Sequence, residues 1–394
     1  MGIGADGWAG LPARVHQLIA DAGAVVGSPR QLAIVPERAG QQRYPLPSPL
    51  REGLPGLMQS LGDRPTVVLA SGDPLVFGIA ATLIDLVGAH RVRVHPTVSS
   101  VSLAAAELGW PSDSFDVVRV STDLAALRRV LTPGRRVLVL SADERTPGQV
   151  ANLLTDAGYG RSALTVLCDL GSAEQRRTDA VAEEFAASPV AVSRLNIVAL
   201  GLAGGPGRAT VGGLPDDAFE HDGQLTRRDA RASALARLAP APGQLLWDVG
   251  AGAGSVAIEW ARVDPRCRAV AVERDPVRAE RIARNAATLG ATGVTVVSGA
   301  APAALAGLPA PQAVFVGGGA TARGLLETCW HSLRSGGRLV THGVTLETGA
   351  LLADWHARHG GELIRLTVER AEPLGSFRGW VASRPIVQWS ATKP

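Results

Sequence analysis

A glycine-rich segment at residues 247–255, with the sequence WDVGAGAGS, constrains the fold of this chain more than any other feature. It stands between an apolar run at 245–249 and a run at 255–262 whose apolar residues have helical spacing. Glycines at such a position allow a sharp turn from strand to helix and let the backbone approach a ligand closely. The segment therefore predicts an open α/β sheet with a ligand site at the carboxyl ends of its strands.

An acidic residue follows this loop at the distance that a strand–helix–strand unit requires. Glu273 ends the next apolar run, 268–272, and lies nineteen residues beyond Gly254. A carboxylate at the end of the second strand can accept hydrogen bonds from both hydroxyls of a ribose. The alternative is a solvated carboxylate at a strand end. The glycines are spaced GxGxG rather than GxGxxG, which disfavours a dinucleotide-binding dehydrogenase.

The rest of the second half alternates between strand and helix patterns. Strands are expected at 294–297, 313–316 and 338–344, and helices at 277–289, 325–333 and 346–359. Strict alternation favours right-handed crossovers and a parallel sheet. Two final strand patterns, 362–369 and 385–389, have no long helix between them, so we expect the last strand to lie antiparallel. The expected fold is Rossmann-like.

A cluster of glycine and proline at residues 201–207 marks a linker. It predicts two domains, 1–207 and 215–394. The first half is also α/β but less regular, and we expect two lobes that meet near residue 98. Its expected strands are 66–70, 91–95, 136–140, 163–168 and 195–200, with a helix at 75–87.

Composition excludes several classes of protein. Three distant cysteines, Cys168, Cys267 and Cys329, provide neither a disulfide framework nor zinc spacing, so we expect no metal and a cytoplasmic location. No run of eighteen apolar residues exists, which argues against a membrane span. The net charge is +3 without a basic block, which argues against nucleic acid as a partner. Lys393 is the only lysine; the abundant arginine reflects either codon bias or binding of a polycarboxylate ligand.

Segments of the second half resemble the precorrin C15-methylating, decarboxylating domain called CbiT. They are 224–231 (QLTRRDAR), the glycine loop, 299–302 (GAAP), 316–319 (VGGG), 336–340, 344–348 and 385–389. The resemblance covers nearly all of 215–394. It implies an S-adenosylmethionine (SAM) site formed by Thr226, Gly250, Ala251, Gly252, Ala253, Gly254, Glu273, Ala300, Ala301 and Gly317. The family commonly has lysine at the position of Arg227.

Three segments of the first half resemble the tetrapyrrole methylase fold, in particular the C5-methylating domain called CbiE. They are 2–7 (GIGADG), 69–78 (LASGDPLVFG) and 97–104 (TVSSVSLA). The resemblance implies a second SAM site, formed by Gly4, Gly72, Asp73, Pro74, Ser99 and Ser100. As an alternative, Gly-Asp-Pro is an ordinary turn sequence. The family has a full apolar strand before the first glycine loop, for which little room exists before Gly4.

Together the two resemblances imply methylation of a reduced precorrin at C5 and C15, with decarboxylation of the C12 acetate. This would convert precorrin-6B to precorrin-8 in cobalamin biosynthesis. A cobalt-containing precorrin, nucleic acid and a non-catalytic SAM-binding role are alternatives. Relatives of the second domain form tetramers, so a homo-oligomer is expected.

Six residues are candidates for catalysis or for substrate binding. Asp73 could orient an amino group or hold a tetrapyrrole nitrogen. Arg227 and Arg231, with Arg228 between them, could bind peripheral carboxylates, or they form an ordinary charged helix surface. His342 is a candidate acid or base, as is His221, although a single histidine is more often structural.

Overall fold

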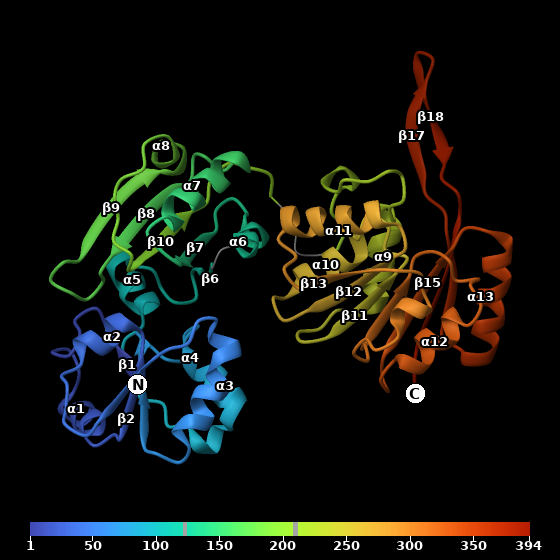
Figure 1. The fold of residues 1–394 in the computed structure, drawn as a ribbon. Coiled ribbons are helices and arrows are strands. Elements are labelled where there is room, and N and C mark those ends of the chain that lie inside the picture. The colour runs from blue at the N-terminus through green and yellow to red at the C-terminus, as the bar shows by residue number, and fades with distance from the viewer. Residues whose placement is uncertain (121–123, 208–211) are drawn as a thin grey trace. The chain divides into compact units, whose positions relative to one another are not determined.

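Contacts between residues divide the chain into two units, which we describe separately. The computed structural model describes residues 1–120, 124–207 and 212–394. Unit 1 comprises Met1–Leu124 and Thr132–Pro206, and unit 2 comprises Ala125–Leu131 and Gly207–Pro394 (Figure 1). In these described ranges no helix has the length and apolar character needed to span a membrane.

Unit 2 is built on one seven-stranded sheet. The strands are β11 (Leu245–Val249), β12 (Arg268–Glu273), β13 (Val294–Ser298), β14 (Ala313–Val316), β15 (Arg338–Gly343), β16 (Glu362–Leu366) and β19 (Ile386–Thr392). Their order is β13-β12-β11-β14-β15-β19-β16. Strands β11 to β15 pair in parallel, whereas β19 is antiparallel to both β15 and β16. This confirms the Rossmann-like sheet with an antiparallel last strand.

Helices cover both faces of this sheet. They are α9 (Arg228–Leu238), α10 (Ser255–Val263), α11 (Pro276–Leu289), α12 (Leu325–Ser332) and α13 (Leu346–His359), and α6 (Ala125–Val130) packs against α11. Alternate residues of a strand point to opposite faces. Accordingly, Leu246 packs with α9 and α10, whereas its neighbour Trp247 packs with α12 and α13. Burial on both faces explains why the central strands are almost wholly apolar.

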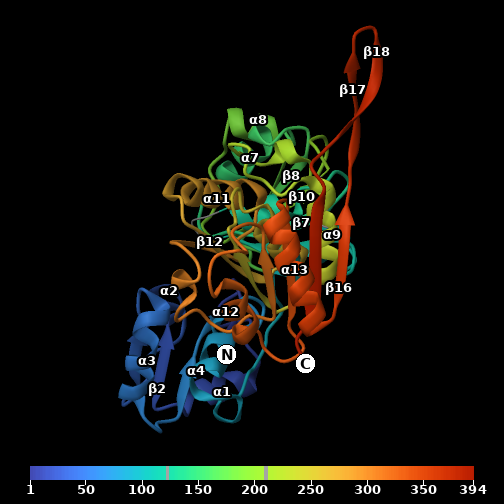
Figure 2. The same ribbon diagram turned by 90° about the vertical axis from the view of Figure 1, so that its right-hand side faces the viewer.

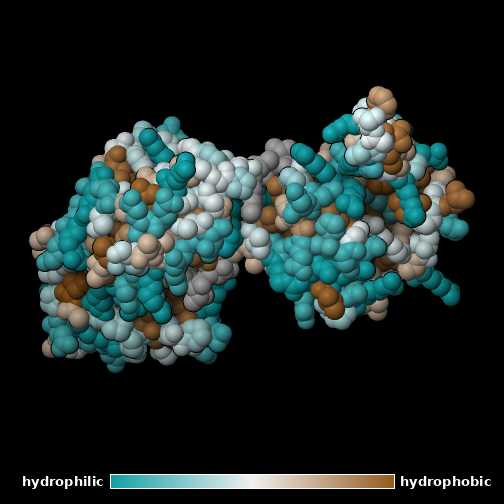
Figure 3. Space-filling model, turned by 90° about the horizontal axis from the view of Figure 1, so that it is seen from above, coloured by the Kyte–Doolittle hydropathy of each residue, from teal (hydrophilic) through white to brown (hydrophobic). Residues whose placement is uncertain are grey.

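A hairpin that the sequence analysis did not expect projects from unit 2 (Figures 1 and 2). Strands β17 (Glu369–Leu374) and β18 (Phe377–Ala382) pair only with each other, and the expected strand at 362–369 ends at Leu366. Gly375, with a φ of 60°, and Ser376 form the two-residue turn. Figure 3 shows hydrophobic residues scattered among hydrophilic ones over the visible face, including the projecting end.

Unit 1 has two lobes. The first contains the parallel sheet β3-β2-β4 and the parallel pair β1-β5, formed by β1 (Gly2–Ile3), β2 (Ala24–Gly27), β3 (Gln42–Pro45), β4 (Thr66–Val68) and β5 (Ala70–Ser71). Its helices are α1 (Ala13–Ala20), α2 (Pro29–Ile34), α3 (Leu50–Leu61) and α4 (Ile79–Val87).

The second lobe contains a mixed five-stranded sheet of order β6-β7-β10-β8-β9. Its strands are β6 (Asp116–Arg119), β7 (Arg136–Leu140), β8 (Ala163–Cys168), β9 (Arg176–Val181) and β10 (Asn196–Gly201). Helices α5 (Ser100–Leu108), α7 (Thr146–Asp156) and α8 (Ala182–Ala187) accompany it.

The expected strand at 91–95 is wrong. The 3₁₀ helix η1 (Ala89–Arg91) occupies its start, and the following residues join no sheet. The neighbouring strand β1 has only two residues, so it offers a short edge for pairing. A backbone hydrogen bond from Gly2 N to His95 O, 2.9 Å long, connects the two segments.

Candidate functional sites

A cavity of about 1040 Å³ lies in unit 2 at the carboxyl ends of β11, β14 and β15, and we call it the C-terminal cavity. Five residues that the sequence analysis assigned to a SAM site line it: Thr226, Gly250, Ala251, Gly252 and Gly317. Arg227 and His342, two of the catalytic candidates, also line it. These residues come from segments distant in sequence, and the parallel sheet brings them to one edge, as expected for an open α/β fold.

The glycine loop is packed too tightly for side chains. Gly250 and Gly252 have φ angles of 69° and 59°, a region that favours glycine. A Cβ at Gly252 would lie 2.6 Å from Gln224 O, and one at Gly250 would lie 3.0 Å from Gly318 O. The loop therefore presents bare backbone to the C-terminal cavity and packs closely against Gln224 and Gly318, which line the same cavity.

Glu273 holds this loop in place. Its Oε2 accepts a hydrogen bond from Gly252 N at 2.8 Å, and its Oε1 accepts one from Asp275 N at 3.0 Å. The side chain is 5% exposed. Glu273 does not line the cavity, and neither do Ala253, Gly254, Ala300 or Ala301.

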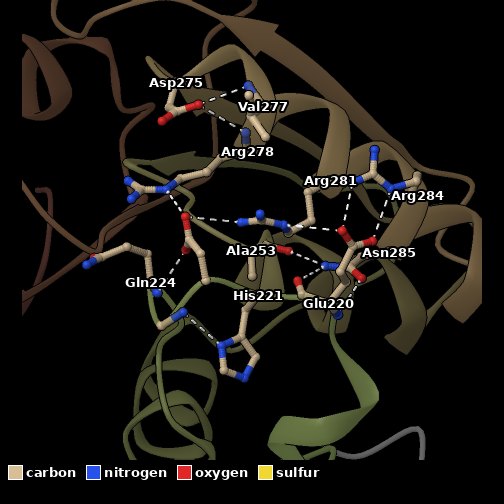
Figure 4. Close-up of polar contacts among 12 residues, drawn as sticks. Glu220, His221, Gln224, Ala253, Asp275, Val277, Arg278, Arg281, Arg284 and Asn285 are labelled. Atoms are coloured by element: carbon tan, nitrogen blue, oxygen red, sulfur yellow. Dashed lines mark hydrogen bonds and ion pairs between the residues drawn. The ribbon is translucent and has the colours of Figure 1, made fainter.

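Residues 219–227, which we call the strap, run across the glycine loop and form one wall of the cavity. Its acidic residues pair with arginines of α11: Asp222 lies 2.8 Å from Arg278, and Glu220 lies 2.7 Å from Arg284 (Figure 4). Hydrogen bonding to Arg278 lowers the pKa of Asp222 well below its usual range. These ion pairs were not predicted from the sequence, although arginines spaced by three residues along α11 indicate a charged helix face.

The Ala253 peptide is held between the strap and α11. Its N–H donates to Gln224 O at 3.1 Å, and its carbonyl accepts from Asn285 Nδ2 at 3.0 Å. The same Asn285 amide group donates to Glu220 O at 2.9 Å, so one buried side chain connects the loop to the strap.

Arg231 is not accessible to a ligand. Its side chain is fully buried and pairs with Glu259 at 2.6 Å and with Asp216 at 3.2 Å. It also donates to the carbonyls of Thr226 and Leu214. We therefore correct its expected carboxylate-binding role: Arg231 positions the strap.

The two other arginines of this cluster differ from Arg231 and from each other. The Arg227 side chain lines the C-terminal cavity, is 55% exposed and lies 3.6 Å from Asp216. Arg228 is exposed but does not line the cavity. Arg227 is therefore the member of the predicted cluster that can meet a ligand.

Asp248, which the sequence analysis did not single out, lies two residues before the first glycine of the loop. It is 1% exposed, and its Oδ2 accepts from Ala257 N at 2.9 Å. Its Oδ1 has no hydrogen-bond partner. Burial, with a smaller contribution from the charge of Glu273, raises the pKa of Asp248 to about 7.

His342 is buried at the cavity wall. Its Nε2 lies 2.8 Å from Gln388 Oε1, and its ring meets Phe315 edge-on at 5.0 Å. Burial lowers the pKa of His342 to about 4. The ring is therefore neutral at neutral pH. It can accept or donate a hydrogen bond, but it has no extra proton to give as a general acid. His221 accepts a turn hydrogen bond from Gly223 N and does not line the cavity.

Unit 1 has its own cavity of about 390 Å³ between its two lobes, which we call the N-terminal cavity. The predicted Gly4, Gly72 and Ser100 line it. Asp73, Pro74 and Ser99 do not. Asp73 Oδ1 accepts a hydrogen bond from Leu75 N at 2.8 Å, which is the contact expected if Gly-Asp-Pro is an ordinary turn. Ser99 is the N-cap of α5.

Charged residues that the sequence analysis did not assign also line the N-terminal cavity: Arg30, Arg119, Arg194 and Asp169. Asp169 has a φ of 51°, which is unusual for a residue other than glycine, and it accepts a hydrogen bond from Ser193 Oγ at 2.9 Å. No group of three or more His, Cys, Asp or Glu residues within the described ranges is arranged to hold a metal ion.

Two family models match the chain, one in each half. A model of the Tetrapyrrole (Corrin/Porphyrin) Methylases matches residues 1–186, and a Precorrin methyltransferase domain model matches residues 217–393. A relative from Sinorhizobium sp, Precorrin-6Y C(5,15)-methyltransferase [decarboxylating], is 44% identical over 397 residues, which cover 100% of this chain and 95% of the relative. The chain belongs to the precorrin-6Y C5,15-methyltransferase (decarboxylating) family.

Two further similarities concern shorter proteins. The Cobalt-precorrin-6B C(15)-methyltransferase (decarboxylating) of Salmonella typhimurium is 30% identical over 167 residues, 41% of this chain and 85% of that relative. A crystal structure of the C-terminal domain of precorrin-6Y C5,15-methyltransferase from Rhodobacter capsulatus is 48% identical, with a TM-score of 0.45. It covers 47% of this chain and 100% of that chain.

The protonation of His342 provides a test of the site's burial. Because its pKa of about 4 in the folded chain lies below the ordinary 6.5, the unfolded chain binds more protons between these values. Stability should therefore increase as the pH rises from 4 to 6.5, by at most about 1.4 kcal/mol per pH unit from this group. Urea unfolding at several pH values should show a shallower increase for His342→Gln. The exposed His331→Gln serves as control, and a slope equal to that of the unsubstituted chain in His342→Gln would contradict the assignment.

Proposed function

We propose that this chain uses SAM to methylate C5 and C15 of a reduced precorrin and removes the C12 acetate carboxyl as carbon dioxide. The conversion is that of precorrin-6B to precorrin-8 in cobalamin biosynthesis. The supporting observation is that a chain of this family has two separate glycine-lined cavities, one in each unit. We assign C5 to the CbiE-like domain, 1–207, and C15 with the decarboxylation to the CbiT-like domain, 215–394.

The residues of the C-terminal cavity fit SAM. Gly250 and Gly252 line the cavity with backbone, and the absence of a Cβ lets the loop pack closely against Gln224 O and Gly318 O. Asp248 does not line the cavity, but its buried side chain precedes the loop and has one oxygen without a hydrogen-bond partner. A bound SAM supplies an electrophilic methyl group on a sulfonium. The loop, the strap and Gly317 would hold it, and the N-terminal cavity would hold the second SAM through Gly4, Gly72 and Ser100.

The side chains present suit this chemistry. The bridging carbons of a reduced tetrapyrrole are enamine-like nucleophiles, so the protein mainly has to align the reactants in a cleft from which water is excluded. Neutral His342 at the cavity wall is consistent with a site that needs no strong acid. Arg227 can hold a peripheral carboxylate. Three buried free cysteines fit a reducing cytoplasm.

The cobalt-containing version of the same steps is a second candidate. It is favoured by the similarity to the Salmonella enzyme, whose name specifies cobalt-precorrin-6B. Parallel assays with metal-free and cobalt-loaded substrate distinguish the two by their relative kcat/KM.

The full chain, incubated with SAM and precorrin-6B, should give a product that has gained two methyl groups and lost one carbon dioxide, measured by mass spectrometry.

Gly252→Val should abolish C15 methylation and decarboxylation, because its side chain would collide with Gln224 O, and should spare C5 methylation. Gly72→Val, at a φ of 59° in the N-terminal cavity, should do the reverse. Absence of any methyl transfer by the unsubstituted chain would refute the function, and loss of both methylations in one variant would refute the division.

Removal of the Glu273 carboxylate should loosen the glycine loop. Glu273→Ala loses the hydrogen bonds from Gly252 N and Asp275 N, and should weaken SAM binding at one of two sites by about tenfold. Isothermal titration of the full chain measures this. Glu280→Ala, an exposed position on α11, is the control. Unchanged affinity at both sites would contradict the role given to Glu273.

We further propose that the chain forms homo-oligomers through the hairpin β17–β18. An isolated two-stranded hairpin is marginally stable in water. Here the part next to its turn exposes Leu374 and Phe377, which are cross-strand neighbours on one face and are 68% and 78% exposed. A second copy of the same hairpin would cover these side chains and pair the open strand edges.

Phe377→Asp should therefore reduce the oligomer to a smaller species, measured by light scattering on the eluting protein. Leu346→Asp, which removes a leucine that is 89% exposed elsewhere in unit 2, should leave the mass unchanged. A monomeric unsubstituted chain, or equal masses for both variants, would contradict the proposal.

A further inference from the structure

The C-terminal cavity continues past the glycine loop to the root of the hairpin. Ser383 N donates to Val368 O at 2.8 Å, which extends the β17–β18 pairing by one step toward the sheet. Val368, Ser383 and the adjacent Arg384 line the cavity together with Arg370 of β17. The cavity thus has a loop end and a hairpin end. Its volume of about 1040 Å³ is at the upper limit of the range for single small-molecule sites, so it has room for more than one ligand.

The hairpin end combines apolar walls with Arg370 and Arg384, and it contains one acidic side chain of β17, that of Glu372. Leu366, Val368, Val381 and Ile386 provide the apolar lining. Such a surface suits the face of a flat apolar ring system, whereas arginine guanidinium groups suit carboxylates attached around its edge.

The arginines of this cavity differ in how far their charges are already neutralised. Arg370 pairs with Asp229 at 2.6 Å and donates to Ser383 Oγ at 3.3 Å, so its guanidinium is fixed in orientation. Arg227 has the long 3.6 Å contact to Asp216. Arg384 is exposed, and within the described residues it takes part in no ion pair or hydrogen bond. Arg384 is therefore the cation of the cavity that is free to pair with a ligand.

We propose that Arg384, assisted by Arg370 and Arg227, binds peripheral carboxylates of the tetrapyrrole, so that the hairpin root forms the substrate end of the C15 site. This rests on the proposed function and adds to it residues outside the helix that the sequence analysis favoured. A planar guanidinium can hold a carboxylate through two parallel hydrogen bonds, and this sets the ring's position as well as its affinity. The root and the turn of the same hairpin then have different roles: substrate binding and self-association.

The test uses the full chain with SAM and precorrin-6B, and follows C15 and C5 methylation separately by mass spectrometry. Arg384→Ala should raise the KM for the tetrapyrrole in C15 methylation by about tenfold, the usual effect of losing one charged hydrogen-bonded contact. The KM for SAM should not change, because the loop end of the cavity is intact. C5 methylation by the other unit of the same chain is an internal control.

Two further variants make the result specific. Arg384→Lys keeps the charge but not the paired geometry, and should recover part of the affinity. Arg365→Ala removes an exposed arginine of β16 outside the cavity, and should behave as the unsubstituted chain. Titration with SAM and the oligomeric mass establish that each variant is folded and assembled.

The outcomes separate the proposal from the function on which it rests. If the unsubstituted chain transfers no methyl group, the proposed methyltransferase function is refuted. If the unsubstituted chain is active but Arg384→Ala keeps an unchanged tetrapyrrole KM, or shifts it no more than Arg365→Ala, the substrate end lies elsewhere. A rise in the KM for SAM equal to that for the tetrapyrrole would show a general disturbance of the cavity and would also overturn the assignment.

Discussion

The carboxylate of Glu273 and the amide of Asn285 hold adjacent residues of the glycine loop of unit 2, and the arrangement of the C-terminal cavity depends on this. A loop with bare backbone pays a large entropic cost on ordering, because glycine has more conformations to lose than any other residue. Hydrogen bonds to Gly252 N and to Ala253 O offset this cost before any ligand arrives. The strap completes the support through Gln224 O, which also explains why no side chain is possible at Gly252.

Arginine provides nearly all the positive charge of this chain, and the burial of each side chain determines whether it forms internal ion pairs or can bind a ligand. Arg231 is completely enclosed, so its charge must be compensated by Glu259 and Asp216, and removing one partner of such a pair typically costs about 3–5 kcal/mol. Arg370 is half-exposed and paired, while Arg384 is exposed and unpaired within the described residues. The same residue type thus serves as internal brace, oriented contact and free ligand-binding group.

Much of the fold could be predicted because apolar periodicity and glycine placement are local signals. The expected strands at 136–140, 163–168, 245–249 and 313–316 coincide with β7, β8, β11 and β14, and the expected helix at 346–359 coincides with α13. The hairpin was missed because its apolar residues face solvent rather than a core, although the Gly375-Ser376 pair is a recognised turn signal.

The site was predictable where backbone conformation defines it and less so where side chains do. Gly250, Gly252 and Gly317 lie at the cavity as expected, because a glycine in the sequence directly indicates a position where the backbone cannot accommodate a side chain. By contrast, sequence adjacency grouped Arg227 with Arg231, whereas Arg227 precedes α9 with extended backbone and is exposed, and Arg231 within α9 is fully enclosed. Asp248 and Arg384 have no local pattern that distinguishes them, because burial and an unfilled partner are properties of the folded chain.

The attachments of the strap differ in their exposure to solvent, so dissolved ions affect some of them and not others. Its outer part is tied to α11 by the pairs of Glu220 and Arg284, both about half-exposed, which dissolved ions screen readily. Its inner part is tied by Arg231, which no ion can approach. Rising ionic strength should consequently weaken the side-chain ion pair of Glu220, whereas the backbone of Glu220 stays hydrogen-bonded to the buried Asn285 and Thr226 O stays hydrogen-bonded to Arg231, so the strap remains on the glycine loop.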